Sequence, residues 1–183
     1  MALTATATRV VKNEIIRELS LRNCQVFQTS LNRPNLHYSV MDKSKALILI
    51  PKMVSQVGEG GVIVYTITRK DADNMAVTLR ERLAPHGVTA YHAGMSPLNR
   101  SAVQRDFMQD RVKVVVATIA FGMGIDKPDI RLVFHLGMPG SVEAYYQQTG
   151  RAGRDGLASR CILFHSGGDI NKRVFMSQKE HIQ

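Results

Sequence analysis

Two arginines in a glycine-rich segment have the clearest chemical potential in this sequence. Arg151 and Arg154 lie three positions apart within Gln147 to Gly156, at the expected end of a helix. Core packing poorly explains charged groups between glycines, whereas a guanidinium donates paired hydrogen bonds to phosphate oxygens. That chemistry stabilises charge on a γ-phosphoryl group during its transfer. The segment therefore favours a phosphate site, and the alternative is structural pairing with Asp155 or Glu143.

A second segment, which ends at Asp126, combines two glycines with a hydroxyl and a carboxylate. Gly122 and Gly124 permit close approach of the backbone to a ligand. Thr118 and Asp126 suit a ribose or a sugar-phosphate. The two glycines are not a dinucleotide-binding fingerprint, because the third glycine would have to stand at Lys127. The sequence therefore argues against a nicotinamide-dependent oxidoreductase.

Two further polar segments each follow an apolar run. Thr68 and Arg69 stand at the start of an expected helix, where free N–H groups and the helix dipole favour an anion. Thr68 can also act only as a helix cap, because Asp71 follows at the spacing of a capping box. His92 and Gly94 follow the next run along the chain.

Short β-branched runs, alternating with stretches of helical periodicity, must position these segments. Near-continuous apolar runs are typical of strands in a parallel sheet that is covered on both faces. The expected strands are Val26 to Thr29, Leu36 to Val40, Val62 to Thr66, Val88 to Tyr91, Val112 to Thr118, Leu132 to Leu136 and Cys161 to His165. The fold class is predicted as α/β, a doubly wound parallel sheet with right-handed crossovers. Ligands bind beyond the carboxyl ends of such strands, so the polar segments should share one edge.

Helices are expected between these strands. One, between Thr66 and Val88, repeats apolar residues at helical spacing. The others are a helix with Ser96 as N-cap and Pro97 as first residue, a helix from Ser141 to Gly150, one from Asp169 to the end, and one over Lys45 to Val57. Pro51 lacks a donor and is expected to kink or end the last of these.

The start of the chain reads differently from the rest. A short helix is expected there, with Val11, Ile15, Ile16 and Leu19 on one side. The polar, proline-bearing stretch from Ser30 to Asn35 is typical of a linker. One helix and one strand cannot bury a core of their own, so this part is interpreted as the edge of something larger.

Composition narrows the class of protein. The chain has 183 residues, is 44% hydrophobic and carries a formal net charge of +9, which is spread along its length and suits a polyanionic partner. Two cysteines, Cys24 and Cys161, cannot form a four-ligand zinc site or a secreted disulfide framework. No apolar segment approaches the roughly 18 residues of a membrane span, and no signal peptide is recognisable. We expect an intracellular protein.

Several motifs resemble those of the RecQ family of ATP-dependent DNA helicases. They are ALTATAT at Ala2 to Thr8, NRPNL at Asn32 to Leu36, ATIAFGMGIDKPDIR at Ala117 to Arg131 and YYQQTGRAGRDG at Tyr145 to Gly156. The resemblance covers nearly the whole chain. It implies that residues 1–31 are the C-terminal edge of a first helicase lobe with its linker, that 32–170 are a second RecA-like lobe, and that 171–183 begin a following segment. This lobe would have the fold of P-loop NTPases without a P-loop of its own.

The resemblance also implies roles for individual residues. Arg154 would be the arginine finger, with Arg151 and Gln147 beside it at an ATP site between the lobes. Nucleotide contacts would come from Gly122, Gly124, Asp126, Gly150 and Gly153, single-stranded DNA contacts from Thr68, Arg69, His92, Gly94 and Thr118, and coupling between hydrolysis and strand separation from Thr4, Ala5 and Thr6. The family implies 3′–5′ unwinding, single-stranded and forked DNA as partners, and work in DNA repair, recombination and replication. The location would be nuclear in a eukaryote and cytoplasmic in a bacterium.

The chain departs from the family pattern in three respects. Gln148 stands where members usually have glutamate, so a neutral amide replaces an acidic contact. The sequence contains no G-x-x-x-x-G-K-[ST] loop and no Asp-Glu pair, which a complete site needs to hold ATP and Mg²⁺. The cysteine-bound zinc subdomain and the winged helix are also missing. We therefore expect a fragment of a longer helicase, inactive alone, whose metal is held in cis by the first lobe.

Two alternatives to this reading are open, and a few residues need a separate interpretation. The chain could be a stand-alone module that binds nucleic acid without catalysis, or a lobe of an RNA helicase. His135 and His165 end apolar strands and are interpreted as half-buried polar caps, since no second metal ligand is suitably spaced. Tyr145 and Tyr146 could stack on a base, although helical spacing places one of them in the core.

Overall fold

The chain forms two compact units, residues 1–34 and residues 35–183. The computed structural model describes residues 2–4, 9–27, 32–84, 86–122, 124–171 and 174. The division between the units falls within the stretch expected to be a linker, Ser30 to Asn35. The interpretation of the first unit as the edge of another lobe stays a prediction.

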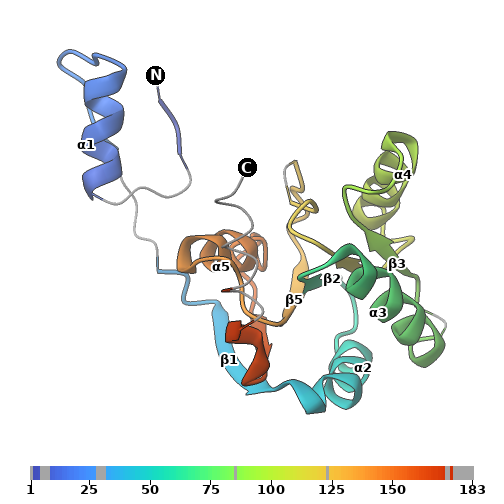
Figure 1. Ribbon diagram of the computed structural model, residues 1–183. Helices are drawn as coiled ribbons and strands as arrows, with labels where there is room; N and C mark the ends of the chain where they lie inside the picture. The colour runs from blue at the N-terminus through green and yellow to red at the C-terminus, as the bar shows by residue number, and fades with distance from the viewer. Residues whose placement is uncertain are drawn as a thin grey trace. The chain divides into compact units, whose positions relative to one another are not determined.

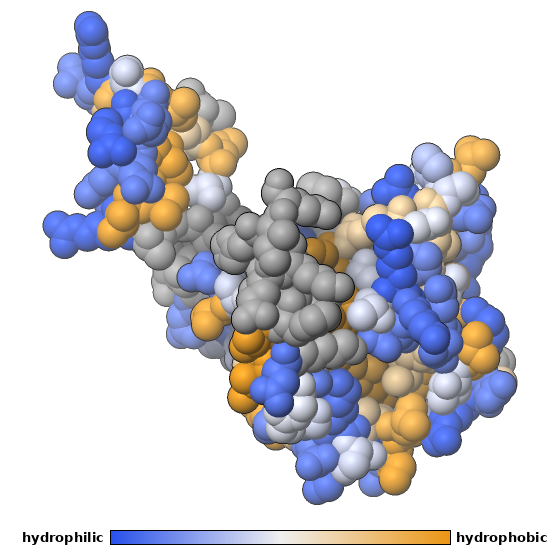
Figure 2. Space-filling model, viewed as in Figure 1, coloured by the Kyte–Doolittle hydropathy of each residue, from blue (hydrophilic) through white to orange (hydrophobic). Residues whose placement is uncertain are grey.

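The first unit contains a single described helix, α1 (Arg9–Glu18), as its apolar spacing predicted. None of the residues of α1 is buried, and Val10 and Leu19, the latter just past the helix end, are 66% and 58% exposed. Figure 2 shows hydrophilic residues along one side of this helix and hydrophobic residues along the other. The strand expected over Val26 to Thr29 is wrong for its first two residues, which are exposed coil, and its last two lie outside the described residues.

The second unit is built on a parallel sheet of six strands (Figure 1). They are β1 (Leu36–Asp42), β2 (Gly61–Thr66), β3 (Val88–Tyr91), β4 (Val114–Ala117), β5 (Ile130–Leu136) and β6 (Ser159–His165). Their order in the sheet is β1-β6-β5-β2-β4-β3, and every paired neighbour is parallel. The prediction of a parallel α/β sheet is confirmed, with strand ends that differ by at most two residues.

Helices cover both faces of this sheet. They are α2 (Ala46–Gln56), preceded by a 3-10 turn (Lys43–Lys45), α3 (Arg69–Arg82), α4 (Pro97–Met108) and α5 (Val142–Thr149). Successive residues of a strand point to opposite faces. Accordingly, Val62 and Val64 of β2 join a core with α2 and α3, whereas Ile63 and Tyr65 join a second core that includes Phe107 of α4. This layering is the doubly wound arrangement expected from the sequence.

Side-chain caps fix where the helices begin. The hydroxyl of Thr68 accepts a hydrogen bond from the backbone N–H of Asp71 at 3.1 Å. Ser96 and Ser141 cap α4 and α5 in the same way, at 3.2 and 3.1 Å. All three starts were predicted from the sequence. The helix expected from Asp169 to the end is helical at 168–171, and most of the residues after 171 lie outside the described part of the chain.

Pro51 was expected to kink its helix or to end it. The helix does not end there, because α2 continues through Pro51 to Gln56. A proline in a helix leaves the carbonyl four residues earlier without its N–H donor. Here that carbonyl belongs to Leu47, and it accepts a hydrogen bond from Nη1 of Arg82 at 3.1 Å. A side chain of α3 thus replaces the missing backbone donor.

None of the described helices is long and apolar enough to cross a membrane.

Candidate nucleotide and nucleic-acid site

The polar segments singled out from the sequence follow neighbouring strands. β2, β4 and β3 are adjacent and parallel, so residues 66–70, 118–126 and 92–94 all leave the same edge of the sheet. β5 lies beside β2, and β6 lies beside β5, in the same orientation. The predicted convergence on one edge is confirmed by this topology.

Arg69, His92 and Gly94 form a tight group at this edge. A Cβ placed on Gly94 would lie 3.1 Å from Nδ1 of His92 and 3.3 Å from Cδ of Arg69, so only a glycine fits without displacing these side chains. Nε2 of His92 lies 3.0 Å from a carboxylate oxygen of Asp73 on α3. Arg69 is exposed at the first position of α3, where the helix dipole also favours an anion.

The two threonines predicted to contact DNA are engaged with the protein backbone. The hydroxyl of Thr68 accepts the capping bond from Asp71, as the structural alternative predicted. Thr118 is half-buried, and its backbone N–H donates to the carbonyl of Tyr91 at 3.2 Å. Thr68 lies next to Arg69 on the edge, and Thr118 begins the loop that leads to Asp126. Their contacts with DNA stay predictions.

The loop from 118 to 126 is held against the sheet by two side chains. The hydroxyl of Tyr65 donates to the carbonyl of Phe121 at 2.9 Å, and Nη1 of Arg151 donates to the carbonyl of Gly122. A Cβ on Gly122 would lie 2.7 Å from Cζ of Arg151. The guanidinium can therefore occupy this position only because residue 122 is a glycine. Gly124 has a φ of +80°, a backbone conformation that favours glycine.

The two arginines of the glycine-rich segment have different surroundings. Nη1 of Arg154 lies 2.5 Å from a carboxylate oxygen of Asp126, and these side chains are 37% and 84% exposed. None of the described carboxylates pairs with Arg151, and its buried Nε has no acceptor among the described residues. A guanidinium that is partly withdrawn from water without a counter-charge is costly. The environment of Arg151 therefore favours an anionic ligand.

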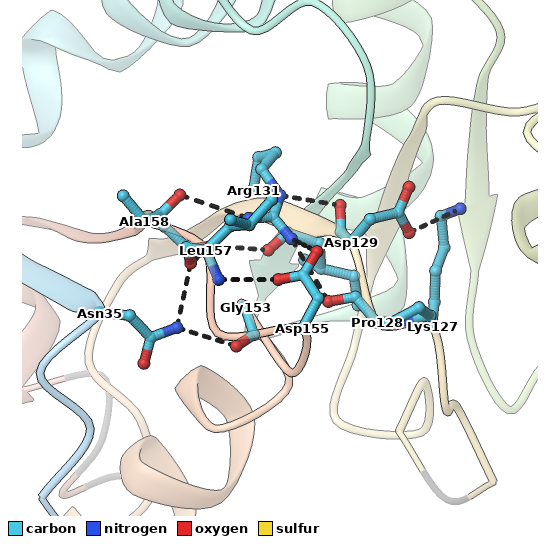
Figure 3. Close-up of polar contacts among 11 residues, drawn as sticks. Asn35, Lys127, Pro128, Asp129, Arg131, Gly153, Asp155, Leu157 and Ala158 are labelled. Atoms are coloured by element: carbon cyan, nitrogen blue, oxygen red, sulfur yellow. Dashed lines mark hydrogen bonds and ion pairs between the residues drawn. The ribbon is translucent and has the colours of Figure 1, made fainter.

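The alternative considered for these arginines was structural pairing with Asp155 or Glu143. Neither pair forms among the described residues. Instead, a carboxylate oxygen of Asp155 lies 2.5 Å from Nη2 of Arg131, the second residue of β5. Figure 3 shows Arg131 reaching from the strand across the turn, where it also donates to the carbonyls of Pro128, Asp129 and Ala158. The Arg131 guanidinium holds the pKa of Asp155 below its usual range. Asp155 is thereby kept ionised and fixes the turn that carries Arg154.

Asn35 closes the same turn from the other side (Figure 3). Its Nδ2 donates to the carbonyls of Gly153 and Leu157 at 2.8 and 3.0 Å. Gly153 is buried with a φ of +53°, and a Cβ on it would lie 2.7 Å from the carbonyl oxygen of Leu157. Gly150 caps the end of α5 in ordinary helical geometry. The nucleotide contacts predicted for these two glycines are not tested by this packing.

Gln147 and Gln148 differ sharply although they are neighbours. Gln147 is exposed at the end of α5. Gln148 is buried, and its Oε1 lies 2.8 Å from Nε2 of His135 on β5. His135 is only 2% exposed, which corrects the expectation of a half-buried cap, because β5 is a central strand and Tyr65 and Tyr145 cover the ring. His165 also differs, since it is exposed at the end of β6.

The remaining candidate residues are spread over both units. Thr4 is exposed in the first unit, and Ala5 and Thr6 lie outside the described residues. Tyr145 and Tyr146 are both half-buried, so the expectation that one of them lies in the core is wrong; Tyr145 packs on the partly exposed Tyr38 and on His135. No group of three His, Cys, Asp or Glu side chains in the described part of the chain could hold a metal ion.

Sequence reasoning missed three residues that shape the site. Asn35 and Arg131 fix the turn that carries Arg154, and Tyr65 contacts the loop that carries Gly122. Asn35 and Arg131 stand inside the motifs NRPNL and GIDKPDIR, so their presence in those motifs was the available signal. Tyr65 lies in an apolar run that gives no sign of its hydroxyl contact.

Known proteins match this chain over most of its length. Residues 42–156 match the family described as the helicase conserved C-terminal domain. The chain is 45% identical over 182 residues to ATP-dependent DNA helicase Q-like 4B of Arabidopsis thaliana, which covers 97% of this chain and 16% of that protein. It is 45% identical over 172 residues to ATP-dependent DNA helicase RecQ of Haemophilus influenzae, covering 92% of this chain and 27% of that protein. These relatives confirm the resemblance predicted from the motifs, and the chain spans well under a third of their length.

A solved structure confirms the fold. Saccharomyces cerevisiae Dbp5 bound to RNA and ADP BeF3 matches with a TM-score of 0.72 over 96% of this chain and 47% of that one, at 21% identity. At this identity the likeness shows the RecA-like fold alone.

Proposed function

Because this chain belongs to the family of helicase conserved C-terminal domains and is similar to RecQ helicases, we propose that it is the second motor lobe of an ATP-dependent DNA helicase. In the whole protein it would couple ATP hydrolysis to translocation on DNA and to unwinding, with 3′–5′ polarity as in the family. The observation that carries the proposal is the presence of two basic groups. One surrounds Gly94 at the carboxyl edge of the sheet, and the other consists of the two arginines on a braced turn between α5 and β6 that contacts the loop after β4.

In this proposal Arg154 acts as the arginine finger. Its partner Asp126 is 84% exposed, and exposed ion pairs contribute only about 0–1 kcal/mol, so the guanidinium can leave Asp126 at little cost. Closure of the two lobes would bring it to the γ-phosphoryl group of ATP, where such a residue is worth roughly 10³ to 10⁵ in rate. Arg151, which the described carboxylates leave without a counter-charge, would meet a second phosphate oxygen, with Gln147 exposed beside it.

The nucleotide and the metal would be held mainly by the other lobe. Mg²⁺ would be bound in cis by the first lobe. Asp126, Gly122 and Gly124 would contact the sugar or the phosphates from this side. Thr4, Ala5 and Thr6 would transmit hydrolysis to strand separation.

The DNA side of the proposal rests on Arg69, His92 and Gly94, with Thr68 and Thr118 as neighbours on the same edge. Arg69 is exposed and free to reach a backbone phosphate. Gly94 is exposed, so its backbone is accessible to a ligand at short range. The formal net charge of +9 adds an attraction for nucleic acid that does not depend on base sequence.

The test uses the full-length protein that contains this chain together with a first lobe. We expect Arg154→Ala to reduce DNA-stimulated ATP hydrolysis at least a thousand-fold while leaving the affinity for single-stranded DNA within about twofold. Arg160→Ala is the matched control, because Arg160 is also exposed but stands near the amino end of β6. Hydrolysis that persists at the wild-type rate in Arg154→Ala would overturn the assignment of the finger.

The same protein separates the proposal from its alternatives. Stimulation of hydrolysis by single-stranded DNA, with little from RNA of the same sequence, supports a DNA motor. Stimulation by RNA alone would make it an RNA helicase lobe. Binding of DNA with no hydrolysis by the wild-type protein under any condition would leave a non-catalytic binding module.

A further inference from the structure

A buried row of side chains connects α5 to Arg151 and to the loop that carries Gly122. The row begins at Gln148, whose Oε1 lies 2.8 Å from Nε2 of His135. The His135 ring stacks on Tyr65, with ring centroids 5.1 Å apart. Tyr65 donates its hydroxyl to the carbonyl of Phe121 and also interacts with Arg151. Three elements, α5, β5 and β2, are thereby linked to one guanidinium.

The contact with Gln148 defines the protonation state of His135. An amide oxygen can only accept, so Nε2 of the imidazole must carry the proton that it donates to Gln148. Nδ1 is buried and has no partner among the described residues, so a second proton there would have no acceptor. Burial also lowers the pKa of His135 to about 4. The ring is therefore neutral at physiological pH.

The groups around the ring provide no negative charge in the described structure. The side chains that contact it are Tyr65 from β2 and Tyr145 and Gln148 from α5. Burial raises the pKa of Tyr65 to about 12, so its hydroxyl stays protonated and keeps donating to Phe121. On β6, the buried thiol of Cys161 lies next to Tyr145 and Thr149. Arg151 lies beyond Tyr65 and interacts with its hydroxyl group.

We propose that His135 is a positioning residue for Arg151, acting through Tyr65, and that Gln148 fixes it in the neutral form with the proton on Nε2. A charged imidazole stacked on Tyr65 would place a positive charge behind the ring whose hydroxyl group interacts with Arg151. Repulsion would then move the guanidinium away from the carbonyl of Gly122. The neutral amide at 148 prevents this, because a carboxylate there would favour the imidazolium.

The proposal assigns a consequence to Gln148, which replaces the glutamate usual in the family. With an amide, the position of Arg151 is independent of pH across the neutral range. With a carboxylate, the same position would vary as His135 gains its proton. The role of Arg151 at a phosphate rests on the proposed function, whereas its placement by His135 does not.

The placement is tested by nuclear magnetic resonance on this 183-residue chain. In the wild type we expect the His135 ring to show one proton, on Nε2, from pH 8 to pH 5, with a constant signal for Nε of Arg151. Gln148→Glu should raise the pKa of His135 by about 1–3 units, and the Arg151 signal should shift with the same midpoint. Gln56→Glu, at the exposed end of α2, is the matched control and should alter neither signal.

A second variant keeps the test decisive if Gln148→Glu does not fold. Tyr65→Phe removes only the hydroxyl between the ring and Arg151, so it should shift the Arg151 signal and leave the His135 tautomer unchanged. The proposal would be overturned if the Arg151 signal stayed unchanged both on protonation of His135 and on loss of the Tyr65 hydroxyl group.

The full-length protein gives the functional counterpart. Gln148→Glu should lower kcat for ATP hydrolysis more at pH 6 than at pH 8, whereas the wild type and Gln56→Glu should share one pH profile. If the wild-type protein hydrolyses no ATP, the proposed function fails. The nuclear magnetic resonance experiment then still decides whether His135 positions Arg151. If hydrolysis is present and Gln148→Glu follows the wild-type pH profile, the link from His135 to Arg151 fails instead.

Discussion

Nη1 of Arg154 lies 2.5 Å from Oδ1 of Asp126, so the arginine at the end of the glycine-rich turn is paired with a carboxylate from the loop after β4. Both residues were selected from the sequence as ligands of one nucleotide. In the structure they instead contact each other, and Asp126 is largely exposed. We interpret the pair as the resting contact of two side chains that separate when a nucleotide is bound.

Replacement of Asp126 by asparagine tests this interpretation. Because an exposed pair contributes little, we expect Asp126→Asn to change the free energy of unfolding of the chain by less than about 1 kcal/mol. In the full-length protein the same variant should raise KM for ATP several-fold, since a ribose or phosphate contact is lost. Denaturant unfolding and steady-state kinetics measure the two quantities. A KM equal to that of the exposed-pair control Asp106→Asn, or a large loss of stability, would contradict the resting-contact interpretation.

Asn35 should contribute measurably to stability, because one amide holds two carbonyls of the turn at 151–158. A net hydrogen bond contributes about 0.5–1.5 kcal/mol, so we expect Asn35→Ala to lower the free energy of unfolding by about 1 to 3 kcal/mol. Asn74→Ala, at an exposed position of α3, is the matched control and should change it little. Equal values for the two variants in urea titrations would show that the turn does not depend on Asn35.

Acid should destabilise the chain partly through His135. Its folded pKa of about 4 is below the unfolded value of about 6.5, so the unfolded chain binds the proton first as the pH falls. This stabilising contribution is complete above pH 6.5 and is lost toward pH 4, with about 2 kcal/mol lost between pH 7 and pH 5. We therefore expect the free energy of unfolding to fall less over that range in His135→Asn than in the wild type. Identical pH slopes would assign acid sensitivity to other groups.

Arg69 should contribute one phosphate contact to single-stranded DNA binding. Each neutralised phosphate adds about −0.7 to the slope of log K against log salt concentration. We expect Arg69→Ala to weaken binding for all base sequences alike and to make this slope shallower by about 0.7. Fluorescence anisotropy with a labelled oligonucleotide measures it, with Arg160→Ala as the control. An unchanged slope would remove Arg69 from the DNA contacts.

Much of the fold could be predicted from the sequence, because apolar runs and helix caps are local signals. Val114 to Ala117 is a fully buried apolar strand in the structure, and Ser96 followed by Pro97 marks the start of α4 as predicted. Local signals failed where the outcome depended on a distant partner. Val26 was taken for a strand residue because of its type, whereas a strand also needs a neighbour to pair with.

The candidate site also has a part that local sequence signals predicted and a part that depends on distant partners. The shared edge of Arg69, His92 and Gly94 follows from parallel strand order, which the alternating pattern of strands and helices predicted. The partners of the arginines could not be predicted, because pairing of Arg131 with Asp155 and of Arg154 with Asp126 depends on how two turns meet in space. The burial of His135 was missed for a similar reason, since its cover comes from Tyr65 and Tyr145 on other elements.

The hydrogen bond from Arg82 to the carbonyl of Leu47 makes the residues at positions 51 and 82 depend on each other. A proline at 51 is tolerated in α2 because a donor already stands at 82, so the arginine must be present before, or arrive together with, the proline. Reversion of Pro51 to an ordinary helix residue would restore the backbone donor and release Arg82 from this constraint. Among diverging copies of this lobe, the two residues should therefore change in a fixed order, although they belong to different helices.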